Sequence, residues 1–239
     1  MAWYKEWFGE EYLELYSHRD EGEAERHVEF VAELFETTPG AILDLACGAG
    51  RHTAALRRRG FRTLGIDLSK TLLAQDPALP KVAGDMRCLP FRASTFDWVL
   101  NFFTSFGYFE TEDENRRVLV EVARVLTPGG RFLIDLFNRD WVLEHLEPEE
   151  SREVDGRTVE IERWYDERSG RINKRIRLAG GEYPFKTFVE SVRAYTSAEV
   201  ETALASAGLH VAARFGSFAG EAFGRDSPRL ILLAGKDPS

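Results

Sequence analysis

The stretch Ala41-Ile-Leu-Asp-Leu-Ala-Cys-Gly-Ala-Gly-Arg-His-Thr53 decides the predicted fold. The run from Ala41 to Ala46 is mostly apolar and lacks helical spacing, which predicts a strand buried on both faces of a parallel sheet. Gly48 and Gly50 carry no Cβ, so the backbone can turn sharply there and come close to a ligand. A helix is expected from Arg51, and the unpaired N–H groups of its first turn favour an anionic group such as a carboxylate. The stretch therefore predicts a strand, a glycine turn and a helix that meet at a nucleoside site without a phosphate.

A second predicted strand, residues 62–68, ends beside Asp67. A carboxylate at the tip of a strand, next to a glycine turn, is well placed to accept hydrogen bonds from both hydroxyls of a ribose. Taken alone, a glycine turn and an acid would equally indicate a dinucleotide-dependent dehydrogenase. Such an oxidoreductase would need a third small residue in the turn, at the position of Thr53.

Strands and helices alternate along most of the chain, which predicts an α/β fold with a doubly wound, mostly parallel sheet. The expected strands cover residues 41–46, 62–68, 81–84, 96–102, 131–136, 209–215 and 230–234. The expected helices cover residues 23–35, 51–59, 69–75 and 112–126, with one more between the capping box at 196–199 and Gly208. The last two strands suit an antiparallel hairpin at the edge of this seven-stranded sheet.

The hydrophobic pattern changes to a period of two between Ser151 and Tyr195. Turn signals stand at Asp155-Gly156, Ser169-Gly170 and Gly180-Gly181. These residues predict an antiparallel β insertion after the fifth strand, within the block 145–195, that lies across one end of the sheet. Two roles stay open for it: it covers the cleft, or it pairs with another subunit through an exposed strand edge and forms a homodimer.

The composition excludes several classes of protein. With 239 residues and 44% hydrophobic content, the chain suits a single domain over 1–239, with residues 1–36 as a helical N-terminal segment. The net charge of −9 disfavours DNA and anionic membranes as partners and favours small or neutral substrates. Cys47 and Cys88 fall on segments expected to be buried and lack metal-ligand spacing, so neither zinc nor a disulfide framework is expected. No run of about 18 apolar residues and no export signal is seen, and a cytoplasmic protein is expected.

Aromatic residues are concentrated before the first long helix. They are Trp3, Tyr4, Trp7, Phe8, Tyr12 and Tyr16. Such a cluster either forms a lid over a cleft or fastens a helix to the core. Both interpretations stay open.

Four features at matching distances resemble the class I S-adenosylmethionine-dependent methyltransferases of the small-molecule type. They are the turn 44–50, the acid Asp67, the pair Asp85-Met86 at the end of the third strand, and the segment 126–131 before the fifth. The terminal hairpin agrees, because this family differs from the dehydrogenases by an added antiparallel strand there. The resemblance covers nearly the whole chain and implies S-adenosylmethionine as the cofactor.

The resemblance also implies which residues bind the cofactor: Asp44, Ala46, Gly48, Gly50, Asp67, Leu68, Asp85, Met86, Asn101 and Phe102. The two glycines would face the methionine and the ribose, with Asp44 near the methionine amino group. Asp67 would bind the ribose hydroxyls and Asp85 the adenine amino group, with Met86 packed on the ring. The backbone near Asn101 would complete the methionine pocket. Many members have glycine at the position of Ala46, and alanine is expected to narrow the turn only slightly because the strand has just ended.

Each of these residues has a plain structural alternative, such as a tight turn or a helix cap, and their conjunction at four strand ends favours the cofactor. Asp97 is expected only to begin the fourth strand. Arg51 either holds a carboxylate or is exposed. His27, His52 and His210 are interpreted as surface or packing residues.

Methyl transfer from a sulfonium is a direct displacement, so the protein mainly aligns the reactants and excludes water. An amine acceptor needs no general base, whereas a hydroxyl acceptor needs one within hydrogen-bond reach. The weak catalytic candidates are Tyr16, His18 and Tyr108, with Thr104, Ser105 and His145 as further possibilities. The segment Asn101-Phe-Phe-Thr lacks the Pro-Pro-aromatic signature of DNA amino methyltransferases, which favours transfer to a nitrogen or oxygen of a small molecule. An RNA or protein methyltransferase and a non-catalytic binder of the cofactor are the alternatives.

Overall fold

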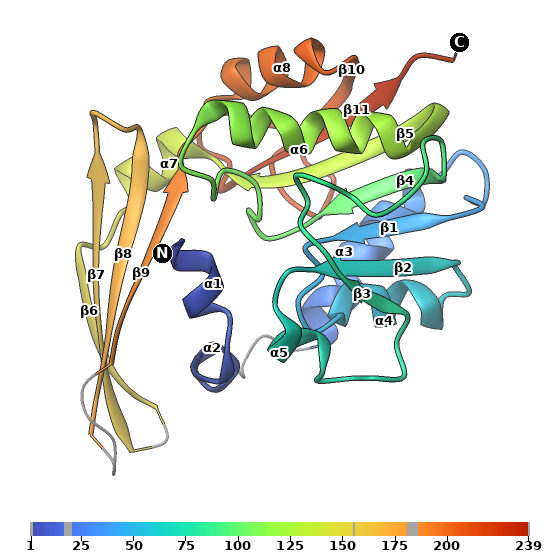
Figure 1. Cartoon of the computed structure of the whole chain (residues 1–239). Coiled ribbons are helices and arrows are strands. Elements are labelled where there is room, and N and C mark those ends of the chain that lie inside the picture. The colour runs from blue at the N-terminus through green and yellow to red at the C-terminus, as the bar shows by residue number, and fades with distance from the viewer. Residues whose placement is uncertain (1, 17–20, 155, 181–185, 239) are drawn as a thin grey trace.

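The computed structural model describes residues 2–16, 21–154, 156–180 and 186–238. Its main sheet has seven strands in the order β10-β11-β5-β4-β1-β2-β3. They are β1 (Ile42–Leu45), β2 (Thr63–Asp67), β3 (Lys81–Ala83), β4 (Phe96–Asn101), β5 (Leu126–Phe137), β10 (Leu209–Phe215) and β11 (Arg229–Lys236). The first five are parallel, and β11 runs antiparallel to both β5 and β10 (Figure 1). The predicted fold class, with its terminal antiparallel hairpin, is confirmed.

Helices cover both faces of this sheet because β1 turns alternate side chains to opposite sides. Leu43 and Leu45 pack with α6 (Glu112–Val125) and α8 (Ser197–Ser206), whereas Ile42 packs with α3 (Glu21–Glu33) and α4 (Arg51–Arg58). The short helices α5 (Lys70–Leu73) and α7 (Arg139–Glu144) follow β2 and β5. The carboxyl ends of the parallel strands are left uncovered by these helices.

Two expectations about local structure are wrong. The fifth strand begins at Leu126, earlier than the expected residue 131, because its first residue already pairs with Phe96 of β4. Thr127 in this stretch donates a hydrogen bond of 3.1 Å to the Asp97 carboxylate, which also accepts from the backbone of Gly40 at 2.6 Å. Cys88 is exposed rather than buried, because β3 ends at residue 83 and the chain has already left the sheet.

A second, antiparallel sheet follows β5, as predicted. Its strands are β6 (Glu149–Val154), β7 (Arg157–Asp166), β8 (Arg171–Ala179) and β9 (Lys186–Arg193), in the order β6-β7-β8-β9. Figure 1 shows this sheet across one end of the main sheet. Of the expected turns, Gly170 adopts a left-handed φ of +62°, while residues 155 and 181 lie outside the described residues.

The N-terminal helices α1 (Trp3–Trp7) and α2 (Glu10–Leu15) lie between the two sheets (Figure 1). Trp7 and Leu15 are buried in a hydrophobic cluster with residues of β7 and β8. The Trp7 indole donates to Glu190 of β9 at 2.5 Å, and the backbone carbonyl of Phe8 accepts from Ser69, after β2, at 2.6 Å. The aromatic N-terminal segment therefore packs on the insertion and also reaches the main sheet.

Candidate cofactor and acceptor site

A hollow of about 290 Å³ lies at the carboxyl ends of β1, β2 and β4. Its walls come from the N-terminal helices, the turn after β1, the end of β2 and the segment after β4: Phe8, Tyr12, Leu13, Tyr16, Asp44, Ala46, Cys47, Gly48, Ala49, Arg51, His52, Asp67, Leu72, Phe102, Phe103, Ser105 and Tyr108. We call it the main hollow. Segments that are far apart in the sequence meet in it, at the sheet edge where parallel α/β folds bind ligands.

A second hollow lies beside the end of β3. It is lined by Tyr4, Phe8, Ala46, Ile66, Asp67, Leu68, Ser69, Gly84, Asp85, Met86, Tyr108 and Phe109. Phe8, Ala46, Asp67 and Tyr108 border both hollows, so the two are neighbours. Of the expected cofactor contacts, only Gly50 and Asn101 line neither.

The turn after β1 is left-handed at three alternate residues, Ala46 (φ +60°), Gly48 (φ +56°) and Gly50 (φ +95°). Residues with a Cβ resist this conformation, so the alanine at 46 strains the turn more than the sequence suggested. Gly50 also lets the start of β3 pack closely against the turn, because a Cβ there would lie 2.9 Å from Cδ of Lys81, the first residue of β3.

Asn101 ties β4 to β1 instead of lining a hollow. Its side-chain nitrogen donates to the Leu45 carbonyl at 2.9 Å, and the residue is 1% exposed. Among the described residues, no donor reaches its buried Oδ1 atom, and a buried acceptor without a donor is costly.

Two acids meet at the turn. Asp44 is 1% exposed and accepts a hydrogen bond of 2.6 Å from the Thr53 hydroxyl, and burial raises the pKa of its carboxyl to about 6. Asp67 accepts from the backbone N–H groups of Gly48 at 2.8 Å and Ser69 at 2.7 Å. Burial raises the pKa of Asp67 as well.

The third acid, Asp85, is held by Arg87. The guanidinium donates to both carboxylate oxygens, with Nη2 2.6 Å from Oδ2 and Nε 3.0 Å from Oδ1. The same guanidinium pairs with Glu114 at 2.5 Å and lies 4.3 Å from the centre of the Phe109 ring. An adenine amino group at Asp85 would therefore share an oxygen with Arg87.

His27 and His52 form a buried pair, and His52 borders the main hollow. His27 Nδ1 and His52 Nε2 are 3.2 Å apart, and their rings are stacked at 10°. His52 also stacks on Phe102, with ring centres 4.0 Å apart. Burial lowers the pKa of His27 to about 4 and holds that of His52 well below its ordinary value, so both imidazoles are neutral. Both are packing residues rather than surface residues, and His52 in addition borders the main hollow, a role that no local sequence signal indicates.

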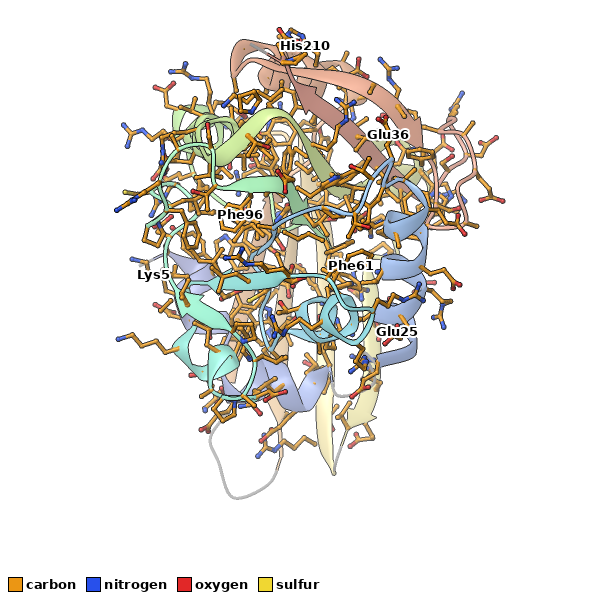
Figure 2. All side chains as sticks on the ribbon, turned by 90° about the vertical axis from the view of Figure 1, so that its right-hand side faces the viewer. Lys5, Glu25, Glu36, Phe61, Phe96 and His210 are labelled. Carbon is orange, nitrogen blue, oxygen red and sulfur yellow. The ribbon has the colours of Figure 1, made fainter. Side chains whose placement is uncertain are left out.

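His210, in contrast, lies on the outer edge of the sheet (Figure 2), where its Nε2 is 3.4 Å from Asp237. His145 is exposed and stacks on Trp141. Neither borders the hollows, and His18 lies outside the described residues.

Of the remaining catalytic candidates, Tyr16, Ser105 and Tyr108 border the main hollow. The Tyr16 hydroxyl accepts a hydrogen bond from Lys174 of β8. Tyr108 packs on Phe8, with ring centres 5.8 Å apart. Ser105 donates to the Phe102 carbonyl at 2.9 Å, while the buried Thr104 accepts from a backbone N–H of β5 and lines neither hollow. Arg51 pairs with Glu23 at 3.5 Å.

The arrangement defines a Rossmann-like nucleoside-binding protein, because a glycine turn, two strand-end acids and two adjoining hollows share one edge of the sheet. Residues 43–134 match the family model described as a methyltransferase domain. The cypemycin N-terminal methyltransferase of Streptomyces sp is 29% identical over 210 residues, which are 80% of this chain and 81% of that protein.

Two solved structures have the same fold. An S-adenosylmethionine-dependent methyltransferase from Clostridium acetobutylicum superposes with a TM-score of 0.79 at 20% identity, covering 95% of this chain and 96% of that one. The sugar N-methyltransferase KedS8 from Streptoalloteichus sp superposes with a TM-score of 0.71 at 22% identity, covering 96% and 94%. These two structures show the fold alone, and the match of residues 43–134 to the family model indicates a class I S-adenosylmethionine-dependent methyltransferase domain.

The residues present fit this cofactor. A Cβ at Gly48 would have only one neighbour within 4 Å, Leu72 at 3.6 Å, and both residues line the main hollow. A side chain at position 48 would therefore take space at the wall where a ligand lies closest to the backbone. Among the described residues, no helix is long and apolar enough to cross a membrane, and no cluster of three or more side chains is placed to hold a metal ion.

Proposed function

We propose that the enzyme methylates an amine nitrogen of a small molecule held in the main hollow. One observation carries this proposal: burial holds the pKa of His52, which borders the main hollow, well below its ordinary value, and its buried neighbour His27 has a pKa of about 4. Imidazoles that weak are poor general bases for a hydroxyl, whereas an amine brings its own lone pair once it is neutral. The bound S-adenosylmethionine supplies an activated methyl group, so the protein's part is alignment and exclusion of water.

The walls of the main hollow suit such an acceptor. Aromatic residues from the N-terminal segment and from the segment after β4 border it, among them Tyr12, Phe102 and Tyr108. Aromatic faces stabilise a cationic nitrogen, and a methylated amine carries positive charge as it forms. Tyr16 and Ser105 also border this hollow, and their hydroxyl groups are hydrogen-bonded to Lys174 and to the Phe102 carbonyl.

For the cofactor, we propose that Asp67 binds the ribose hydroxyls and Asp44 the methionine amino group. Both acids border the main hollow, and Asp67 borders the second as well. Met86 and Leu68 would then border the adenine, since they line the second hollow.

Two relatives support an amine over a hydroxyl. Their names specify an N-terminal methyltransferase and a sugar N-methyltransferase. The acceptor is therefore either an amino group on a small metabolite or the terminal amine of a short peptide. A peptide acceptor would correspond to the protein-methyltransferase alternative.

The test is a screen of paired compounds, each amine matched by its hydroxyl analogue, with formation of adenosylhomocysteine and of the methylated product measured together. Amino compounds should turn over and their hydroxyl partners should not. Turnover restricted to hydroxyl compounds would contradict the proposal. Tight binding of adenosylhomocysteine with no turnover on either set would support the non-catalytic alternative.

We also propose a homodimer formed through the insertion. Of the two edge strands of this sheet, β9 lies against α1, and β6 has the charged residues Glu149, Glu150, Arg152 and Glu153, which discourage pairing along that edge. Contact through the face of the sheet is therefore the favoured form. Light scattering on the full chain at several concentrations would decide, and a monomer throughout would exclude it.

A further inference from the structure

Arg171, the first residue of β8, reaches from the insertion to the segment after β4. Its Nη1 atom donates to the Phe109 carbonyl at 3.0 Å, and its Nη2 atom donates to the carbonyls of Gly107 at 3.0 Å and Tyr108 at 3.2 Å. Three successive backbone carbonyls thus converge on one guanidinium. The other two hydrogen bonds go to the backbone carbonyl of Ser191, at 2.6 Å, and its hydroxyl, at 2.9 Å.

All of these acceptors are uncharged. The neighbouring Arg193 pairs with Glu112 at 3.0 Å and with Glu199 at 2.6 Å, whereas Arg171 forms no ion pair with a carboxylate in the part of the chain that the structure describes. A half-buried guanidinium without an acid partner is costly unless its hydrogen bonds are well made. Five fixed donors make arginine suited to holding several carbonyls in one geometry.

The segment that Arg171 holds is docked on the insertion by a second set of contacts. The Gly107 carbonyl also accepts from the backbone N–H of Arg193 at 2.9 Å. Gly107 has a left-handed φ of +94°, and a Cβ there would lie 3.1 Å from the Arg193 carbonyl oxygen. Only glycine lets the backbone approach β9 this closely.

The carbonyls that Arg171 fixes belong to the residues whose rings border the hollows. Tyr108 lines both hollows and Phe109 lines the second. Their rings are packed by the N-terminal helix, with Trp3 4.8 Å from Tyr108 and Tyr4 5.4 Å from Phe109. The backbone of residues 107–109 therefore determines the position of the Tyr108 and Phe109 rings in the walls of the hollows.

We propose that Arg171 is a positioning residue, through which the β insertion holds Tyr108 and Phe109 in the wall between the cofactor and the acceptor. Arg171 lines neither hollow and acts through the backbone of residues 107–109. This role rests on the proposed placement of S-adenosylmethionine in these hollows. It makes the insertion part of the cofactor site.

The test compares Arg171→Met with Arg177→Met, which makes the same change at an exposed position of the same strand. We expect Arg171→Met to raise the Kd for adenosylhomocysteine by about tenfold, since a small misplacement of a binding group is costly, and Arg177→Met to leave it unchanged. The KM for S-adenosylmethionine should rise more than kcat falls. Arg171→Lys, which keeps the charge but not the fork of donors, should fall between the two.

Gly107→Ala provides a second variant should Arg171→Met fail to fold, because it loosens the same segment from the side of Arg193. It should raise the Kd in the same way, with faster amide exchange over residues 107–109. Unchanged Kd values in folded Arg171→Met and Gly107→Ala proteins would overturn the positioning role. Failure of the wild-type enzyme to bind adenosylhomocysteine would instead overturn the proposed placement of the cofactor, so the two failures are distinguishable.

Discussion

Asp44 shows how burial of one residue couples the site to pH. Its carboxyl has a pKa of about 6 in the folded chain against an ordinary value of 3.8. The folded protein therefore holds a proton that the unfolded chain has lost, and the free energy of unfolding should fall as pH rises from about 4 to about 6. A cationic amino group binds the ionised form, so the Kd for adenosylhomocysteine should increase about tenfold for each pH unit below about 6.

Calorimetry between pH 5 and 7 would measure this slope. Asp67 titrates in the same direction, because burial raises its pKa too. The Asp44→Asn variant separates the two acids: most of the slope should disappear with it. A slope that persists in Asp44→Asn would place the coupled group elsewhere.

Asp67 combines a structural task with the proposed ribose contact. Asp67→Ala should weaken adenosylhomocysteine binding by about 1 to 3 kcal/mol, because ribose hydroxyls would be left without an acceptor. A matched control exists at the opposite end of the sheet, where Asp97 also accepts two backbone N–H groups, those of Gly40 and Ala41. Asp97→Ala should reduce stability without changing the Kd. Equal Kd values for both folded variants would remove the ribose role.

Ala46 is a local strain in the cofactor turn. Its φ of +60° costs an L-residue about 1 to 2 kcal/mol, and Ala46→Gly would remove this strain. Glycine also has more conformational freedom in the unfolded chain, which offsets part of the stabilisation. Ala46→Gly should therefore stabilise the protein by about 0.5 to 1 kcal/mol. Gly50→Ala should act in the opposite direction, because its Cβ would lie 2.9 Å from Lys81 Cδ. Urea unfolding of both variants would measure the pair. Destabilisation by Ala46→Gly would show that the alanine methyl contributes more to packing than the strain costs.

Among the elements, those built from local patterns were predictable from the sequence. Strands β1, β2 and β4 follow from apolar runs that end in turn residues, α6 follows from its apolar face, and α8 follows from its capping box at Thr196. The start of β5 was not predictable, because Thr-Pro-Gly-Gly at 127–130 consists of residue types that are common in turns. It extends as a strand since Thr127 is held by Asp97, a contact that only the folded sheet creates.

Contacts between distant elements were beyond the sequence for a related reason. Nothing local indicates that His27 and His52 share a hydrogen bond, or that Arg171 binds carbonyls more than sixty residues earlier. Most of the expected cofactor contacts border the hollows, whereas Gly50 and Asn101, the last residue of β4, line neither and pack against β3 and β1 instead. Strand ends are fixed by topology alone, but the direction of each side chain depends on its neighbours.

The helices α1 and α2 are elements that cannot stand alone. They have five and six residues, well below the length at which an isolated helix is stable in water. Their order comes from contacts such as Trp7 on Phe188 of β9, with ring centres 4.7 Å apart. The N-terminal segment and the insertion are therefore expected to order together.

At the scale of the whole molecule, the two sheets are joined mainly across the site. The N-terminal segment packs its buried Trp7 against the insertion and presents Phe8, Tyr12 and Tyr16 to the main hollow. The clusters on either face of the main sheet contain only Tyr4 from this segment. The main sheet can thus keep its core when the N-terminal helices are lost, whereas the site cannot keep its walls.

Removing residues 1–18 should accordingly reduce adenosylhomocysteine binding and turnover by about tenfold or more, with a much smaller change in the cooperative unfolding of the main sheet. Two point variants distinguish the two roles of the N-terminal segment, which are to cover the site and to pack on the insertion. Tyr12→Ala should lower affinity or turnover with little loss of stability, because Tyr12 borders the main hollow. Trp7→Ala should cost about 3 to 5 kcal/mol of local stability in the cluster with the insertion, because Trp7 is 1% exposed. Full turnover by the truncated enzyme on its identified acceptor would mean that the N-terminal aromatic residues only pack, and that the site is closed by the segment after β4 alone.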